Sequence, residues 1–422
     1  MHRLAIFLLL ATLTAHAQTL ARPGLAGSGL NTDPWWKQAV FYQVSASPAN
    51  PPGGNPAEQL RLMQSVDYKS IATRLDALHT LGIDALLLPM PGLPGSPEPT
   101  PALDDFDGLI HQASQRGIRV LLTFPAPSPS ADLAPTARFW LNHGVAGFRL
   151  VTHPSASPQD TQFLVQSLRT ITNSAVGQRI VLSDFNSGAI PTPIPSPPSR
   201  RAPTARSNRS VDSADAQLQV DSQLSQLNLL DARSLRPLLA QSLTTSNLLL
   251  DFHPPAAPPN SPDPYPALSR AIATILLTTH PAALVNADPG LELQPSFPSA
   301  NPLPTAPPAP TLADWYSKLS ALHHGNATVR YGSVTTLNFD TQDALVWVIR
   351  PASNSGLAPP VVVACNLSSS PLQLSLSSAI HGLNLRGSFL LTLLRTDEAM
   401  GAQNLGSVSL PPFAVYIGEL HR

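Results

Sequence analysis

Three segments in the first part of the chain share one pattern, in which a stretch of helical periodicity meets a glycine and then a short apolar run. They are residues 67–89 (DYKSIATRLDALHTLGIDALLLP), 105–123 (DFDGLIHQASQRGIRVLLT) and 138–154 (RFWLNHGVAGFRLVTHP). The glycine is a suitable helix end, and the apolar run after it is typical of a buried strand. Strands that alternate with helices pair in parallel through right-handed crossovers. The pattern therefore predicts an α/β fold built on a parallel sheet.

The same alternation extends to eight units along the chain. Further strands are predicted over residues 39–45, 179–185, 217–222, 247–252 and 281–286, and helices over 159–172, 234–243, 268–278 and 312–323. Eight such units close as a (β/α)8 TIM barrel. Short alternating strands between residues 329 and 420 predict a small C-terminal all-β sandwich domain. The predicted domains are the barrel, 35–325, and the sandwich, 326–422.

Composition narrows the class of protein. The 422 residues carry a net charge of −1, and 12% of them are charged, which indicates no nucleic-acid partner. The 47 prolines accompany 43% hydrophobic residues, a combination that favours stiff, neutral loops over disorder. The single cysteine, Cys365, excludes an internal disulfide and a cysteine metal cluster. No cofactor and no metal site are predicted.

The first residues have the pattern of an export signal. Residues 1–17 begin with His2 and Arg3, continue through an apolar run, and end in Ala-His-Ala. This pattern predicts a secretory signal peptide, followed by a polar lead over 18–34 and a secreted or periplasmic protein. The alternative is a membrane anchor, but the run is short for a bilayer, and no stable membrane span is predicted.

The stretch at 138–154 places an arginine, Arg149, inside a strand that is predicted to be apolar on both faces. Gly147-Phe148-Arg149 lies near the end of this strand. A buried guanidinium without an acceptor costs several kcal/mol, so Arg149 requires a carboxylate or a similar partner.

Several motifs resemble the α-amylase superfamily (glycoside hydrolase family 13), in sequence order from about residue 33 to 420. They are WWKQAVFYQVSA at the first strand, LGIDALLLP at the second, DFDGLIHQASQRGIRV at the third, and FWL followed by GVAGFR at the fourth. The resemblance implies the barrel, the C-terminal β domain, and an α-glucan or oligosaccharide as partner. It also implies hydrolysis by two carboxyl groups, one attacking the anomeric carbon and the other protonating the leaving oxygen. Residues 124–136 leave no room for the small domain that usually follows the third strand.

The chain departs from the family's motifs at the positions that carry the chemistry. The nucleophile position is Val151, and the acid position is Asp184, one methylene shorter than the family's glutamate. After the seventh strand, His253 is kept but the carboxylate position is Pro254. Asp251 stands one position early, which predicts that its side chain faces the opposite side of the strand.

Each surviving polar residue has two interpretations. Asp184 is a candidate acid, or it pairs with a buried arginine such as Arg149. Arg149 and His253 are candidate substrate-binding residues. The pair His323-His324 is interpreted as a helix end, with metal binding as the alternative. Four arginines between residues 200 and 209 are interpreted as part of a solvated loop, with an anion site as the alternative.

The first hypothesis for function is an exported, degenerate family member, a pseudoenzyme that has lost most hydrolysis and keeps a structural or glucan-binding role. An alternative is a working α-glucan hydrolase or transferase, with Asp184 as acid and Asp251 or Asp288 as the second carboxylate. A third is a scaffold that binds a protein partner through its Pro-rich loops. A misalignment of one or two residues would also account for the missing carboxylates, but Gly147-Phe148-Arg149 fixes the register at the fourth strand.

Overall fold

The structure is a computed structural model of the chain. It describes residues 34–44, 68–91, 103–124, 132–151, 157–184, 216–226, 230–245, 247–252, 265–286, 311–339, 341–352 and 358–422.

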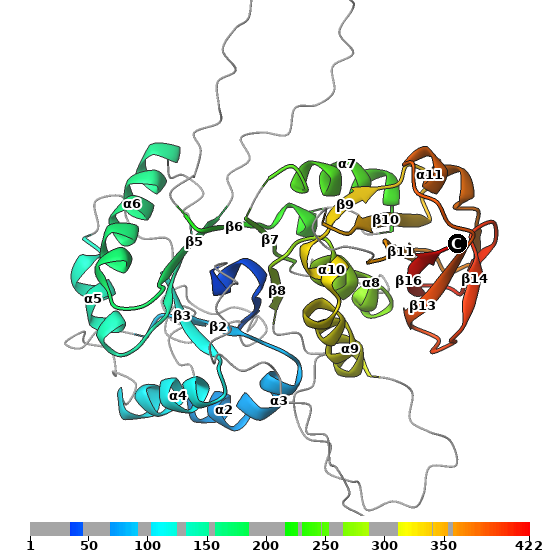
Figure 1. The fold of residues 1–422 in the computed structure, drawn as a ribbon. Helices are drawn as coiled ribbons and strands as arrows, with labels where there is room; N and C mark the ends of the chain where they lie inside the picture. Colours follow the sequence, from blue (N-terminus) through cyan, green and yellow to red (C-terminus); the bar gives the residue numbers. More distant parts are fainter. Residues whose placement is uncertain are drawn as a thin grey trace, which may run out of the picture. The chain divides into compact units, whose positions relative to one another are not determined.

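Eight parallel strands form the first sheet, which is drawn from blue to green in Figure 1. They are β1 (Val40–Gln43), β2 (Ala85–Pro89), β3 (Arg119–Phe124), β4 (Gly147–Leu150), β5 (Ile180–Asp184), β6 (Leu218–Asp221), β7 (Leu248–Leu250) and β8 (Ala283–Asn286). The order across the sheet is β7-β6-β5-β4-β3-β2-β1-β8, so neighbours in sequence are neighbours in space except where β1 meets β8. The strands curl into a nearly closed barrel.

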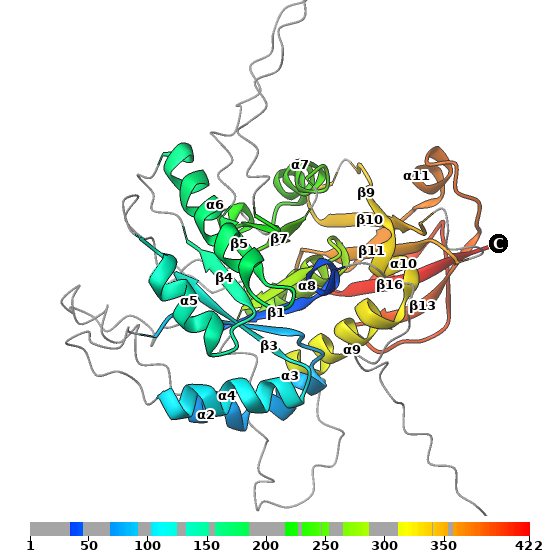
Figure 2. The same ribbon diagram turned by 60° about the vertical axis from the view of Figure 1, so that its left-hand side comes forward.

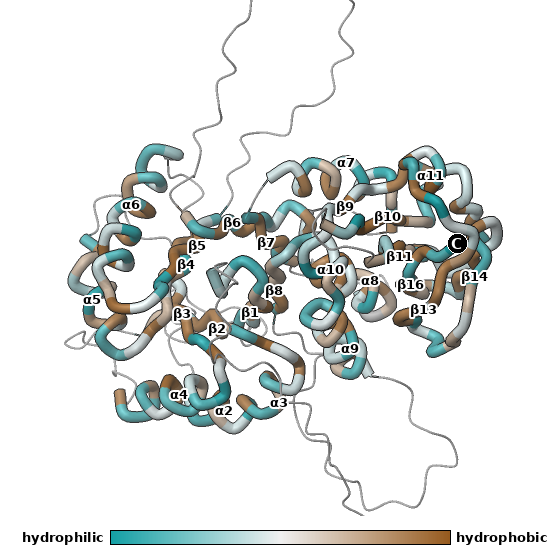
Figure 3. The backbone as a smooth tube through the Cα atoms, viewed as in Figure 1, coloured by the Kyte–Doolittle hydropathy of each residue, from teal (hydrophilic) through white to brown (hydrophobic). Residues whose placement is uncertain are grey.

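Helices cover the outer face of this barrel (Figures 1 and 2). They are α2 (Tyr68–Thr73), α3 (Leu75–Thr80), α4 (Leu103–Gln115), α5 (Ala134–Asn142), α6 (Pro158–Ser174), α7 (Ala232–Ser242), α8 (Tyr265–Thr278) and α9 (Leu312–Gly325), with the short 3-10 helix η2 (Gln223–Gln226) after β6. Figure 3 shows that the barrel strands are mostly hydrophobic whereas the helices mix both kinds of residue. This difference follows from burial, because the strands are covered on both faces and each helix on one.

Alternate residues of each strand point into the barrel. The inward side chains form a separate apolar cluster in the middle of the barrel, with Phe41, Leu121, Leu182 and Leu249 among its members. The short 3-10 helix η1 (Trp35–Gln38) packs its tryptophans against this cluster from the N-terminal end of the strands. The barrel is therefore filled and closed at that end, and the opposite end holds polar groups.

The ring closes between β7 and β8 in an unusual way. The described residues of these two strands lie against each other without a backbone ladder between them. Instead, the Asn286 side-chain Nδ2 donates to Asp251 Oδ1 at 2.7 Å and to the Phe252 carbonyl oxygen at 2.6 Å. A side-chain amide thus joins the two strands at the C-terminal edge of the barrel.

Antiparallel strands make up the C-terminal part of the chain. They are β9 (Ser333–Thr336), β10 (Ala344–Arg350), β11 (Val361–Asn366), β12 (Leu372–Leu374), β13 (Phe389–Arg395), β14 (Ala402–Asn404), β15 (Val408–Leu410) and β16 (Val415–His421), with the short helices α10 (Ala327–Tyr331) and α11 (Ser377–Gly382). Six of these strands form one sheet in the order β14-β13-β16-β11-β10-β9, and β12 pairs with β15. The two sheets enclose their own core, which includes Val346, Val362, Leu376 and Tyr416.

A buried arginine links this β domain to the barrel. Arg236 of α7 donates to the backbone carbonyl oxygens of Phe339 and Thr341, and to that of Ala344 at 2.8 Å. Helix α7 also contacts β9 and β10.

The predicted fold class is confirmed: a (β/α)8 barrel followed by an all-β domain. The single helix expected before β2 is two helices, because the chain breaks at Arg74. The short elements α10, α11, β9 and β14 were not predicted. The predicted signal peptide and the loop arginines near residue 200 lie outside the described residues, and the domain boundaries stay a prediction. Within the described part of the chain, no helix is long and apolar enough to cross a membrane.

Candidate functional site

Strand β4 brings an arginine to the C-terminal end of the barrel. Phe148 and Leu150 pack outward toward the helices, so Gly147 and Arg149 point inward. A Cβ on Gly147 would lie 2.1 Å from the backbone oxygen of Ile180 in β5. The glycine therefore permits the close approach of β4 to β5 and leaves space for the Arg149 side chain above it.

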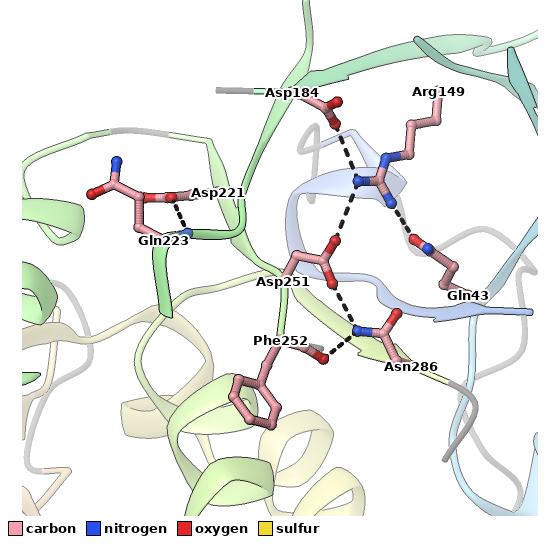
Figure 4. Close-up of polar contacts among 8 residues, drawn as sticks. All are labelled: Gln43, Arg149, Asp184, Asp221, Gln223, Asp251, Phe252 and Asn286. Atoms are coloured by element: carbon pink, nitrogen blue, oxygen red, sulfur yellow. Dashed lines mark hydrogen bonds and ion pairs between the residues drawn. The ribbon is translucent and has the colours of Figure 1, made fainter. Parts of the chain in front are cut away.

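Arg149 holds two carboxylates through one nitrogen (Figure 4). Its Nη2 lies 3.1 Å from Asp184 Oδ1 and 3.2 Å from Asp251 Oδ2. Its Nη1 donates to Gln43 Oε1 of β1. The guanidinium thus connects strands β1, β4, β5 and the end of β7 across the barrel. Ion pairs of this kind fix side chains firmly when they are out of water.

The two carboxylates differ in their access to water. The Asp251 side chain is 1% exposed and also accepts a hydrogen bond from Asn286. The Asp184 side chain is 23% exposed. Asp184 is therefore the carboxylate at the mouth of the barrel, whereas Asp251 lies beneath it.

Val151 follows Arg149 by two residues on the same face of β4. Its backbone N–H still donates to the Phe124 carbonyl oxygen of β3 at 3.1 Å, which continues the strand pairing by one residue. By strand alternation its isopropyl group points toward the barrel mouth, beside the Arg149 cluster. This position has no oxygen that could attack a sugar.

A further carboxylate, the buried Asp221 at the end of β6, faces away from this cluster. Its Oδ1 accepts the backbone N–H of Gln223 at 2.9 Å (Figure 4). Burial raises its pKa above the ordinary value, and the hydrogen bond from Gln223 opposes that shift. Sequence reasoning gave no role to Asp221, and its alternation with inward-facing Val220 is the signal that places it on the outer side.

The structure brings together part of the predicted site. The pairing of Asp184 with Arg149 is confirmed, although the role of Asp184 as an acid stays a prediction. The prediction that Asp251 faces away is wrong: Leu249 points into the barrel, so Asp251, two residues later, does as well, and it contacts Arg149. His253 and Asp288 lie outside the described residues.

The histidine pair at the end of α9 is built into the packing. His323 Nδ1 lies 2.8 Å from the Leu277 carbonyl oxygen, and burial lowers the pKa of His323 to about 4. His324 Nε2 lies 3.4 Å from Asp84 Oδ2. Among the described residues, no group of three or more histidine, cysteine or acidic side chains is placed to hold a metal ion.

Comparison with known proteins finds a short sequence match and a wider likeness in fold. No protein-family model matches the sequence. Trehalose-6-phosphate hydrolase of Escherichia coli (strain K12) is 34% identical over 101 residues, which are 21% of this chain and 17% of that protein. The match thus spans about a sixth of that relative.

Solved structures match over nearly the whole chain. Isomaltulose synthase from Klebsiella sp. LX3 superposes with a TM-score of 0.61 at 14% identity, covering 92% of this chain and all of that one. Trehalose-6-phosphate hydrolase from Bacillus licheniformis superposes with a TM-score of 0.61 at 12% identity, with the same coverage. The fold is that of glycoside hydrolase family 13 enzymes. In the α-amylase superfamily, as the sequence motifs imply, the end of β4 carries the nucleophile, and here that place is Val151.

Proposed function

We propose that this chain is an exported α-amylase-type protein of carbohydrate metabolism that binds an α-glucan or a related oligosaccharide and has lost most or all hydrolysis. The observation that carries the proposal is the replacement of the attacking carboxylate by Val151 beside an intact Arg149. Retaining hydrolysis needs one carboxylate that reaches the anomeric carbon and one acid that reaches the leaving oxygen. An isopropyl group can do neither.

Two features of the barrel mouth support binding. Arg149 Nε and Asn286 Oδ1 are buried and have no hydrogen-bond partner among the described residues. A sugar presents hydroxyl groups that both donate and accept, and such groups would satisfy both atoms once the cluster opens, because both atoms are out of water in the closed cluster. The fold likeness to enzymes whose names specify isomaltulose and trehalose 6-phosphate supports a sugar as the class of ligand.

One observation favours a second candidate, an active hydrolase or transferase. Asp184 and Asp251 contact the same nitrogen, so their oxygens lie at most about 6 Å apart, close to the spacing of a retaining pair. Against this, Asp251 is 1% exposed and held by Arg149 and Asn286. It cannot touch an anomeric carbon unless the cluster opens.

The test measures turnover and binding on the same protein. Maltooligosaccharides, isomaltulose and trehalose are assayed for reducing-sugar or glucose release, and titration calorimetry measures their binding. We expect sugar binding without release of glucose or reducing sugar. We also expect weaker binding for Arg149→Lys, because an ammonium group lacks the planar pair of N–H donors of a guanidinium. Release that disappears in both Asp184→Asn and Asp251→Asn would establish the second candidate. If the protein neither binds these sugars nor releases glucose from them, the result favours the scaffold that binds a protein partner.

A further inference from the structure

Two arginines lie at the N-terminal end of the barrel, on the opposite side from Arg149. Arg119 is the first residue of β3, and Arg179 directly precedes β5. Both side chains are half-buried. Strand β4 lies between these strands, so the two backbones are about 10 Å apart, a span that two arginine side chains can close.

Trp35 of η1 contacts Arg119 and the residue that precedes Arg179. The Arg119 guanidinium carbon lies 4.3 Å from the centroid of the Trp35 ring. The indole Nε1 of the same tryptophan donates to the carbonyl oxygen of Gln178, the neighbour of Arg179, at 3.3 Å. Between them, β4 is preceded by Ala146, whose side chain is small and buried. The Trp35 ring thus stacks on Arg119 and is hydrogen-bonded to the chain directly before Arg179.

No close ion pair balances the charges of these two arginines among the described residues. Neither Arg119 nor Arg179 has an ion pair within 4.0 Å among the described residues, and Arg179 Nε is buried there without a hydrogen-bond partner. Asp84 is the nearby acidic group. Its Oδ2 accepts the backbone N–H of Val40 at 2.9 Å and lies 3.4 Å from His324.

The electrostatics agree with this geometry. Burial is the main cause that lowers the pKa of Arg119 below its ordinary value, Asp84 opposes it, and the positive charge of Arg179 adds to it. Burial also lowers the pKa of Arg179. A cation that is partly out of water beside a like charge is costly, and a bound anion would reduce that cost.

We propose that Arg119 and Arg179 bind a phosphate-type oxyanion at the N-terminal end of the barrel, against the Trp35 ring. Guanidinium groups present planar pairs of N–H donors that match the oxygens of a phosphate. Stacking on Trp35 accounts for the position of Arg119, but it leaves Arg179 Nε without an acceptor among the described residues. The anion can be free phosphate or the phosphoryl group of a phosphorylated sugar.

The experiment titrates inorganic phosphate, glucose 6-phosphate and glucose into the full chain by calorimetry at constant ionic strength. We expect saturable binding of phosphate, with glucose inert at this site. Glucose 6-phosphate binding more tightly than phosphate identifies the sugar phosphate as the source, and equal affinity identifies the free anion. Arg179→Gln should weaken binding at least tenfold. Arg116→Gln, at an arginine that is paired with Asp76 on the outer surface, should leave it unchanged.

A second measurement avoids any folding defect of the variants. Phenylglyoxal modifies accessible arginines of the wild-type protein, and mass spectrometry of its peptides reports each site. Phosphate should protect Arg119 and Arg179 and leave Arg116 reactive. The proposal is overturned if Arg119 and Arg179 are labelled equally with and without phosphate. It is also overturned if the calorimetric titration with phosphate is the same for Arg179→Gln as for the wild-type protein. This site is remote from Arg149, so its failure leaves the proposed sugar function untouched.

Discussion

Replacement of Arg149 by methionine should destabilise the barrel through a carboxylate that cannot reach water. Methionine keeps much of the side-chain length and removes the charge. Asp251, 1% exposed, would keep its hydrogen bond from Asn286 and lose its cation. Breaking a buried ion pair by removing one partner costs about 3–5 kcal/mol, because the remaining charge is uncompensated. We expect a loss of stability in that range for Arg149→Met.

The two carboxylates allow this cost to be divided. Asp184 is 23% exposed and can turn toward solvent, so its coupling to Arg149 should be smaller, about 1–2 kcal/mol. Asp251 cannot turn, and its coupling should be about 2–4 kcal/mol. Double-mutant cycles with Arg149→Met, Asp184→Asn and Asp251→Asn, each followed by denaturant unfolding, measure both values.

A matched control uses the same two residue types on the surface. Arg116 Nε and Nη2 bind the two carboxylate oxygens of Asp76 at 2.6 and 3.2 Å, and the Asp76 side chain is 80% exposed. The cycle for Arg116→Met and Asp76→Asn should give a much smaller coupling, because water replaces the lost partner. If Arg149→Met costs no more than Arg116→Met, the cluster is not an electrostatic core and the reasoning fails.

Three further changes test other parts of the structure. Burial lowers the pKa of His280 and His323 to about 4, whereas the pKa of a histidine in the unfolded chain is about 6.5. Between pH 4 and pH 6.5 the unfolded state therefore binds more protons than the folded state. The free energy of unfolding, measured with denaturant, should therefore be constant above pH 6.5 and fall by up to roughly 3 kcal/mol per histidine toward pH 4. His323→Gln should remove the part of this pH dependence that His323 contributes. Gly147→Ala puts a Cβ against Ile180 O and should prevent a native barrel by circular dichroism, whereas Gly177→Ala, at φ +89° with open space around it, should cost only about 1 kcal/mol. Arg236→Met removes the donor to three backbone carbonyls and should raise hydrogen exchange in β9 and β10, with exchange in β13 as the internal control.

The barrel strands were predictable because parallel strands covered on both faces are apolar runs, and a glycine before β2, β3 and β4 marks the end of the preceding helix. The buried arginine was predictable in the same way, since a guanidinium in such a run requires a carboxylate. The side of the strand on which Asp251 lies was predicted wrongly, because it was inferred from the position of Asp251 relative to the family's motif. The packing of Leu249 inside the barrel instead shows that Asp251, two residues later, also points inward. The hydrogen bonds by which Asn286 joins β7 and β8 could not be predicted from a single sequence, because they connect two strand ends more than thirty residues apart.

The charge of the Arg149 cluster gives a structural reason for the barrel to keep these residues if, as we propose, hydrolysis has been lost. One guanidinium faces two carboxylates, so a third acid at position 151 would add a like charge beside a group that is already fully engaged. With valine at that position, the ion pairs that connect β1, β4, β5 and β7 act as structural links across the barrel mouth. A carboxylate that is bound in this way contributes its interaction energy to the native state rather than to a transition state, and only the latter accelerates a reaction. The chain therefore has a structural reason to keep Arg149, Asp184 and Asp251 that does not require it to cleave a glycoside.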